Sequence, residues 1–399
     1  MQLFVFERAS RGANCHVTTH VTSLATNIAA VLAVFAGALP LSAAAAHEAT
    51  AISVGSAHTC GLTSKGLVEC WGSNFNGQLG NGAVGDRHNP VMVMGLSGAL
   101  AVSAGGQHTC AVTKQHGVMC WGANDHGQLG DGGTTRSFVP VAVQGLASGI
   151  VAVAAGYSHT CALTNTSAVK CWGANSSGQL GVGTTDDSLT PIDVHGLSSG
   201  VSDIGAGQAH NCALTAGDIV RCWGWNGSGQ LGDGTKTQSL VPVRARGVAG
   251  AVGLAVGDDH TCARTAGDIA MCWGENVVGE LGDGNTAEKA TAVRVHGLHS
   301  PVTVIDAGSS HTCVVTADHS ARCWGNNVYG QIGNGTSTAQ TSAVAVKGLR
   351  DVTAIAAGNN TSCALLANGH LKCWGSDEFG QLGDGRTQDS SRPVNVVGF

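Results

Sequence analysis

Cysteines provide the clearest chemistry in this 399-residue sequence. Fourteen of the 15 cysteines fall into seven pairs, and the two members of each pair are ten positions apart. Thiols repeated at one spacing are typical either of disulfides or of thiolate ligands for a metal such as Zn²⁺. The pairs are Cys60 and Cys70, Cys110 and Cys120, Cys161 and Cys171, Cys212 and Cys222, Cys262 and Cys272, Cys313 and Cys323, and Cys363 and Cys373. The remaining cysteine, Cys15, lies near the N-terminus, outside this pattern.

The ten-residue spacing has a geometric meaning in a β-hairpin. If Thr63 pairs with Leu67 around a three-residue turn, Cys60 lies opposite Cys70 on one face of the hairpin. Opposed residues in a non-hydrogen-bonded antiparallel pair have Cα atoms about 4.5 Å apart, which suits a disulfide. The spacing therefore predicts a cross-strand disulfide within each hairpin and an oxidising compartment for the folded protein.

A metal site is the alternative use of these cysteines. His58, Cys60 and Cys70 could share one face and supply three ligands for Zn²⁺. The seventh unit keeps both cysteines but has Thr361 in place of the histidine, so the cysteine pair does not depend on a histidine partner. We therefore predict neither a metal site nor a cofactor.

Six histidines recur two positions before the first cysteine of a pair. They are His58, His108, His159, His210, His260 and His311. A side chain present in nearly every unit is more readily explained by hydrogen bonds that fix the backbone of its own unit than by proton transfer. The tryptophan after each second cysteine is similarly predicted to pack in the core, whereas the additional Trp225 is expected to be exposed.

The sequence shows no recognisable catalytic motif. It has no Ser-His-Asp order, paired-carboxylate motif or phosphate-binding glycine loop. A Ca²⁺ site needs roughly six to eight oxygens, but each Gly-Asp-Gly turn offers one carboxylate, so turn chemistry explains these aspartates. The turns lie at Asp131, Asp233, Asp283 and Asp384. We therefore predict a protein that is not an enzyme.

Charge excludes two classes of partner. Beyond residue 46 the chain has 25 acidic and 18 basic side chains, and the basic ones are scattered singly. Nucleic acids and anionic membranes both require clustered Lys and Arg. We expect neither as a partner.

The cysteine pairs belong to a repeat that fills most of the chain. Cys-Trp-Gly triplets recur at intervals of 50 or 51 residues from Cys70 to Cys373. One unit contains four predicted strands, at 151–155, 159–164, 168–172 and 191–194. A β-type repeat of this length predicts an all-β, seven-bladed β-propeller with four-stranded blades.

Link lengths suggest how the strands are grouped. The link between the fourth strand of one unit and the first strand of the next is of hairpin length, so blades are expected to be offset from repeats. The last strand, 393–396, would then complete the first blade beside Ile52. The ring would be closed by N- and C-terminal strands that share one blade, which leaves no open sheet edge there.

Residues 1–46 differ from the rest and are predicted to be a signal peptide. Arg8 and Arg11 precede the apolar stretch 28–39, and a run of alanines after it suits signal-peptide cleavage. The alternatives are a true start further downstream or an uncleaved membrane anchor. Residues 47–399 are predicted to form one exported propeller domain that is periplasmic, on the cell surface or extracellular.

Three motifs carry a family resemblance over residues 51–399. They are Gly-x-x-His-Thr-Cys-Ala-Leu-Thr, Val-x-Cys-Trp-Gly-x-Asn-x-x-Gly-Gln-Leu-Gly-Asp-Gly and Pro-Val-x-Val-x-Gly-Leu. With these motifs the chain resembles the regulator of chromosome condensation repeat family, which implies a seven-bladed propeller whose end strands share a blade. The paired cysteines and the export segment indicate an exported, bacterial-type member with disulfides.

Known behaviours of this family differ. They include nucleotide exchange on the small GTPase Ran, ultraviolet-B sensing in plants, and inhibition of β-lactamases by a secreted bacterial member. The constant repeat spacing leaves no room for the hairpin wedge of the exchange factor, and export separates the chain from Ran. Exchange of the Ran type is therefore not expected.

The two residues between Gly and the histidine position of each unit are predicted to form a rim around the central opening. Candidate binding residues there are Gln107, Tyr157, Gln208, Asp258, Asp259, Asn359 and Asn360. Tyr157 is the one aromatic residue among them, whereas tight protein-binding sites favour Trp, Tyr and Arg. We predict an exported, monomeric propeller that binds an unidentified protein partner through one face. A carbohydrate-binding or lytic propeller, a β-lactamase-inhibitor-like protein and a purely structural surface protein are the alternatives.

Overall fold

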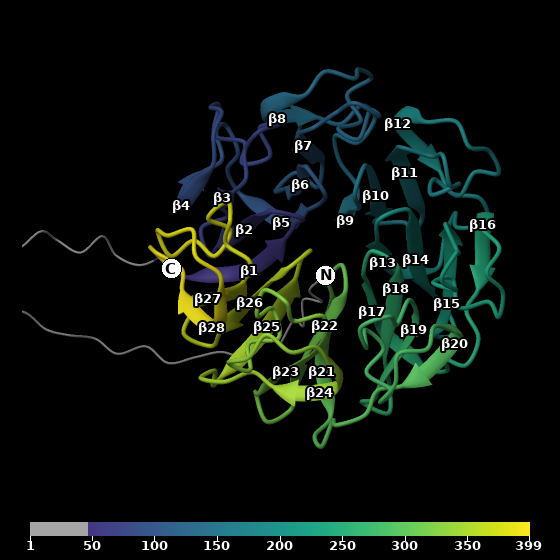
Figure 1. Ribbon diagram of the computed structural model, residues 1–399. Coiled ribbons are helices and arrows are strands. Elements are labelled where there is room, and N and C mark those ends of the chain that lie inside the picture. Colours follow the sequence, from purple (N-terminus) through teal and green to yellow (C-terminus); the bar gives the residue numbers. More distant parts are fainter. Residues whose placement is uncertain (1–46) are drawn as a thin grey trace, which may run out of the picture. The chain divides into compact units, whose positions relative to one another are not determined.

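The computed structural model describes residues 47–399, and every regular element within them is a β-strand. Twenty-eight strands form seven sheets, each made of four consecutive antiparallel strands. The sheets are the blades of a propeller and form a ring (Figure 1), which confirms the predicted fold class. No helix long and apolar enough to cross a membrane occurs in this part of the chain. The predicted export segment, residues 1–46, lies outside the described residues.

Each blade contributes one strand to each of four positions. The first strands are β1 (Ala49–Val54), β5 (Ala99–Ala104), β9 (Ile150–Ala155), β13 (Val201–Ala206), β17 (Ala251–Val256), β21 (Val302–Ala307) and β25 (Val352–Ala357). The second strands are β2 (His58–Thr63), β6 (His108–Thr113), β10 (His159–Thr164), β14 (His210–Thr215), β18 (His260–Thr265), β22 (His311–Thr316) and β26 (Thr361–Leu366). The third strands are β3 (Val68–Gly72), β7 (Val118–Gly122), β11 (Val169–Gly173), β15 (Ile219–Gly224), β19 (Ala270–Gly274), β23 (Ala321–Gly325) and β27 (Leu371–Gly375). The fourth strands are β4 (Arg87–Met92), β8 (Ser137–Ala142), β12 (Ser188–Asp193), β16 (Ser239–Arg244), β20 (Lys289–Arg294), β24 (Gln340–Ala345) and β28 (Ser390–Asn395).

The blades coincide with the repeats, so the predicted offset is wrong. β28 pairs with β27, where Val394 lies opposite Cys373. β1 pairs with β2, where Ile52 lies opposite Gly61. The N- and C-terminal strands therefore do not share a blade. The short link after each fourth strand crosses to the next blade, and the long loop after each third strand returns to its own sheet.

A side-chain clamp allows the long loop to return to its own sheet. In the second blade, the Asn124 side chain accepts a hydrogen bond from the Leu129 N–H at 2.9 Å. The same amide donates to the carbonyl oxygens of Gly133 and Thr135 at 3.2 and 3.1 Å. One buried amide thus holds both halves of the loop and directs the fourth strand to the outer edge of the same blade. Link length, on which the prediction rested, carries no information about this clamp.

All seven predicted disulfides are present, one in each blade. In the first blade Cys60 lies opposite Cys70, and the Thr63 N–H donates to Leu67 O at 2.9 Å, as the predicted register requires. The Cα atoms of the paired cysteines are 4.0 to 4.1 Å apart. Both sulfurs of each pair are bonded to each other and are not free thiolates for a metal.

The hydrophobic cores lie between neighbouring blades. The first core combines Val68 and Leu79 of the first blade with Ala111 and Trp121 of the second. The Trp121 side chain is fully buried, and its indole N–H donates to the carbonyl oxygen of Gln78 in the preceding blade at 2.9 Å. Each repeat tryptophan therefore packs between blades and also links them by a hydrogen bond.

A second set of contacts joins the blades where the first strands end. The Ser56 N–H donates to Gly105 O in the next blade at 3.2 Å, and a related backbone bond links every successive pair of blades. The last of these bonds, from Asn359 N to Gly55 O at 3.4 Å, joins the seventh blade to the first. A Cβ atom on Gly55 would overlap Gly105 O, so this close approach requires glycine. The ring is thus closed by backbone hydrogen bonds and packing rather than by a shared sheet.

Candidate binding face

One end of the propeller, which we call the loop face, carries the β1–β2 turn, the β3–β4 loop and their equivalents. His58 lies opposite Gly72 in the β2–β3 pair, so turn 55–57 and loop 73–86 emerge at the same end. The β2–β3 hairpin tips lie at the opposite end. All the predicted rim residues belong to turns of the first kind, so they lie on the loop face.

The rim residues differ in exposure and are contacted by the preceding blade. Gln107, Tyr157 and Gln208 are exposed, whereas Asp258, Asp259, Asn359 and Asn360 are partly buried. Asn76 Nδ2 donates to Gln107 Oε1 at 2.6 Å. Gln230 Nε2 donates to Asp259 Oδ1 at 2.6 Å. The rim is therefore continuous with the long loops, which the sequence analysis did not include in the candidate site.

Exposed apolar side chains on the loop face were missed by the sequence analysis, apart from Tyr157 and Trp225. They lie in the long loops, several at the variable position after the clamp residue. The large exposed apolar residues of the turns and loops are Phe75, Val84, Tyr157, Trp225, Val277, Val328 and Tyr329. Trp225 is 43% exposed, as expected for the additional tryptophan, whereas each repeat tryptophan is 0% exposed. A comparison of residue types at equivalent positions of the repeats would have revealed them.

The loop face is also strongly acidic. Its turns and loops contain Asp86, Asp125, Asp131, Asp186, Asp187, Asp233, Asp258, Asp259, Glu275, Glu280, Asp283, Glu288, Asp377, Glu378, Asp384 and Asp389. The Lys and Arg residues in the same segments are Arg136, Lys236 and Arg386. Such an imbalance creates a negative potential that attracts cationic groups over several ångströms.

The densest acidic group, which we call the blade-5 acidic cluster, consists of Asp258, Asp259, Glu275 and Glu280. Asp258 and Asp259 form the β17–β18 turn, and the Glu275 N–H donates to Asp259 O at 2.8 Å. Among residues 47–399, none of the four makes an ion pair with a Lys, Arg or His side chain. The fold therefore brings two predicted rim residues together with two carboxylates that the sequence analysis did not single out.

Glu280 occupies a position where the other six blades have glutamine. Its Oε2 accepts from the Val278 N–H at 2.9 Å, the same backbone contact that Gln78 Oε1 makes in the first blade. The other oxygen, Oε1, is buried and has no hydrogen-bond partner in the described chain. Burial, together with the charges of Glu280 and Asp259, raises the pKa of Glu275 to about 7.

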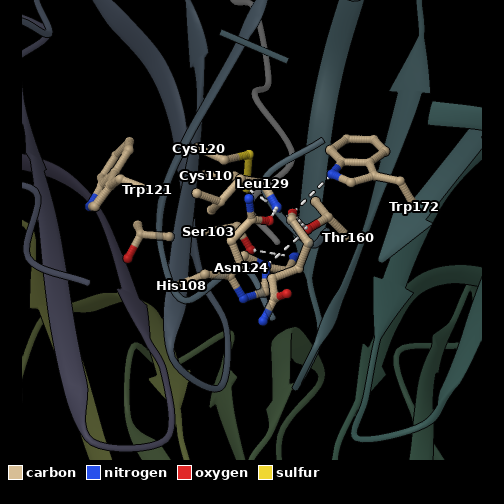
Figure 2. The surroundings of a disulfide bond; sticks show 12 residues. Ser103, His108, Cys110, Cys120, Trp121, Asn124, Leu129, Thr160 and Trp172 are labelled. Atoms are coloured by element: carbon tan, nitrogen blue, oxygen red, sulfur yellow. Dashed lines mark hydrogen bonds between the residues drawn. A yellow bond between two sulfur atoms is a disulfide. The ribbon is translucent and has the colours of Figure 1, made fainter. Parts of the chain in front are cut away.

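The recurrent histidines lie in the seams between blades, as Figure 2 shows for His108 beside Thr160. His108 is fully buried, and its Nε2 lies 2.8 Å from Thr160 Oγ1 in the next blade. Thr160 Oγ1 donates to Gln128 O at 2.9 Å, and the Trp172 indole N–H reaches the same carbonyl at 2.9 Å. Because the threonine proton is directed to Gln128, His108 Nε2 carries a proton and donates it. The histidines are structural, but they bind the next blade rather than their own backbone.

Burial keeps these histidines neutral. It lowers the pKa to about 4 for His58, His159 and His260, and to about 3 for His108, His210 and His311. Their Nδ1 atoms have no partner among the described residues, so a second proton would be placed in a site that offers it no acceptor. The ring of histidines is therefore unsuited to proton transfer near neutral pH.

The seventh blade has a carboxylate in place of the clamp amide. Asp377 Oδ1 accepts from the Leu382 N–H at 2.9 Å, as Asn124 does from Leu129 in the second blade. Asp377 Oδ2 is buried without a partner within residues 47–399. Burial, reinforced by the neighbouring carboxylates of the same loop, raises the pKa of Asp377 to about 7.

These features define a seven-bladed β-propeller whose blades follow the sequence repeat in register. A family model described as the RCC1-like domain matches residues 86–399, and a model of the regulator of chromosome condensation (RCC1) repeat matches residues 49–78. The chain belongs to the RCC1 family of propellers.

Comparison with known proteins agrees with this assignment. The chain is 33% identical to the Arabidopsis thaliana ultraviolet-B receptor UVR8 over 318 residues, which cover 76% of this chain and 72% of that protein. It is 39% identical to the human probable E3 ubiquitin-protein ligase HERC4 over 92 residues, which cover 23% of this chain and 9% of that protein. In fold it is similar to yeast RCC1 (Prp20) in a crystal structure with Kap60, with a TM-score of 0.76, 23% identity and 84% coverage of each chain.

Proposed function

We propose that the protein is an exported, non-enzymatic propeller that binds a protein partner through its loop face. The observation that carries this proposal is the exposure of Tyr157, Trp225 and Tyr329, at 43, 43 and 42%. Tyrosine and tryptophan contribute much of the binding energy at protein interfaces. Disulfides persist in oxidising compartments, so one in every blade supports export.

The relatives support the same class of function. The crystal structure of yeast RCC1 contains a bound protein, Kap60, and UVR8 is by name a receptor. Neither supplies the partner of this chain. The shared frame supports binding, and the side chains of the loop face must supply specificity.

Site-specific crosslinking tests this proposal. A photoreactive phenylalanine analogue is placed at Trp225 on the loop face, or at the exposed Gln115 on a hairpin tip of the opposite face as the matched control. We expect one stoichiometric protein adduct from the loop-face probe in an extract of the producing cells, and none from the control. Equal labelling from both positions, or none, would contradict the proposal. Glycan binding that depends on the rim residues would favour the carbohydrate-binding alternative.

A further inference from the structure

The blade-5 acidic cluster differs from its equivalents by having an acceptor where they have a donor. In the first blade Gln78 Nε2 donates to the hydroxyl of Ser73 at 3.3 Å. The same bond recurs in the seventh blade, from Gln381 to Ser376, at 3.4 Å. In the fifth blade, glutamate replaces both the glutamine and the serine, at positions 280 and 275. Two carboxylates thus occupy the positions of a hydrogen-bonded amide and hydroxyl.

Lysines near the cluster are engaged by other carboxylates. Lys236 pairs with Glu288, and Lys289 Nζ lies 4.0 Å from Asp283 Oδ2. Glu280 Oε1 is buried without a partner in the described chain, although an unpaired buried acceptor is costly. No Lys, Arg or His side chain among residues 47–399 neutralises the cluster, so a positive group from a partner can bind there.

The surroundings indicate which positive group fits. Asp259 and Glu275 are joined through their backbones and are both partly exposed. Asp259 Oδ1 accepts from Gln230 Nε2, which leaves Asp259 Oδ2 and the Glu275 carboxylate for a partner. Two adjacent carboxylates match the forked donors of a guanidinium group better than a single-point ammonium. Val277, in the loop that carries Glu275, is 59% exposed and offers an apolar contact to the same partner.

We infer that the blade-5 acidic cluster is the subsite for an arginine side chain of a protein partner, which binds with its guanidinium group against Asp259 and Glu275. This inference rests on the proposed function and adds the chemistry of the partner. Burial raises the pKa of Glu280, and a guanidinium bound nearby favours its ionised form, so Glu280 adds to the attraction once the arginine is bound. Trp225 and Val277 contact apolar residues next to that arginine.

Peptide binding tests the subsite. The probe is a fluorescent 12-residue peptide with three arginines, each flanked by leucine, and its control carries citrulline, a neutral analogue of the same shape, at the three positions. The test variant is Asp259→Ser with Glu275→Ser, because serine occurs at the equivalent positions of other blades. The matched control is Asp125→Ser with Glu378→Ser, which removes the same charge from exposed positions of the same face. Thermal unfolding establishes that each variant is folded.

We expect the test variant to bind the arginine peptide at least tenfold more weakly than the unchanged protein, and the control variant to differ by less than threefold. Glu280→Gln, which restores the residue of the other blades, should weaken binding to an intermediate degree. Equal loss in both double variants, or equal binding of arginine and citrulline peptides, would overturn the inference. Protection of the cluster by added Ca²⁺ or Zn²⁺ without any response to the peptide would also overturn it, in favour of a metal. If Trp225→Ala abolishes capture of the cellular partner but the serine variant retains it, the proposed function stands and the arginine subsite fails.

Discussion

The seam between the seventh and first blades is held differently from the other six. Those six seams each contain a buried histidine that reaches a side chain of the next blade. In the closing seam Thr361 takes the place of the histidine and donates to Ser376 O within its own blade at 3.0 Å. Phe399 packs in this seam at the repeat position where the other six blades have Leu or Val, with its ring centroid 5.9 Å from that of Trp71. The His47 N–H also donates to Gly398 O at 2.8 Å, which ties together the two ends of the described chain.

Other contacts are common to every seam. In the closing seam the Trp71 indole N–H and the Thr59 hydroxyl both donate to Gln381 O, each at 2.9 Å. The comparison indicates that the tryptophan and the backbone form the general interface between blades. The histidine is therefore a replaceable addition to that interface, because the closing seam keeps these other contacts without one.

Acid should weaken the six histidine seams but not the closing seam. Each histidine has a folded-state pKa of about 3 or 4, below the usual value of 6.5 for a solvated histidine. The unfolded chain therefore binds more protons, and stability falls as the pH drops from 6.5 toward the folded-state values. At pH 5 each histidine should lower the free energy of unfolding by about 2 kcal/mol relative to pH 8, or about 12 kcal/mol for the six together. Denaturant unfolding with the disulfides intact, measured at several pH values, tests this.

A single substitution isolates the histidine contribution from that of the acids. Carboxyl groups with raised pKa, such as Asp203 at about 6, titrate with the opposite sign, because ionisation disfavours their folded state. His210→Gln keeps a side-chain donor for Thr261 and removes the titration. The variant should lose about 2 kcal/mol less than the unchanged protein between pH 8 and pH 5. An unchanged pH dependence would show that this histidine is not protonated on unfolding.

Phe399→Ala should open the closing seam selectively. The phenylalanine is 5% exposed and packs in a core with Trp71 and Leu371, so its removal should cost about 3–5 kcal/mol. Hydrogen exchange should show lost protection in the first and seventh blades and little change in the fourth. Val397→Ala, at a position 50% exposed, is the control and should change stability by less than about 0.5 kcal/mol. Uniform loss of protection around the ring would mean that the closing seam does not open on its own.

Removing one disulfide should have a smaller effect, similar in every blade. The loops closed by the bridges have equal length, so Cys262→Ala with Cys272→Ala should cost about 2–3 kcal/mol in the chain-entropy model. The corresponding double substitution of Cys363 and Cys373, in the core of the closing seam, tests whether that seam is more sensitive. Melting temperatures of the two non-reduced variants give the comparison, and a gap of several degrees would show that the seams are not equivalent.

Asp377→Asn should slightly stabilise the seventh blade. Asparagine restores the donor of the loop clamp and removes a buried unpaired oxygen, for a gain of about 1 kcal/mol. Because the folded-state pKa is raised to about 7, the native state disfavours ionised Asp377, so the gain should be largest above pH 7 and shrink as the pH falls. Thermal unfolding of both proteins at pH 8 and pH 5 tests this, and a gain independent of pH would show that ionisation is not its cause.

The periodic features of this fold were predictable from sequence, and those that depend on contacts between repeats were not. The cysteine spacing specified both the hairpin register and the disulfides, because Cys60 and Cys70 are close in sequence and in space. The grouping of strands was not predictable from link length, because the Asn124 clamp acts through side-chain hydrogen bonds. Both its donor and its acceptor roles depend on the folded loop.

The candidate site shows the same division. The repeat alignment located Asp258 and Asp259 at the rim, but the contribution of Glu275 and Glu280 required the loop to fold back beside that turn. Their significance lies in a departure from the repeat, since glutamate replaces residues that elsewhere form a hydrogen bond. A comparison of the repeats at each position could have revealed the replacement, although not the buried, unpaired oxygen.

The same type of backbone hydrogen bond joins the seventh blade to the first as joins every other pair of neighbouring blades. The position of the chain ends is therefore set by how the blades are connected along the chain, not by the ring itself. The N–H of His47 and the carbonyl oxygen of Gly398 are 2.8 Å apart, so a short linker could join the two ends of the described chain. New ends could then be placed in the exposed link between any two blades, as in circular permutation. A permuted protein that begins at the fifth blade should keep the same ring, the same disulfides and the same loop face. Evolution could likewise change where the chain starts without changing the surface that it presents.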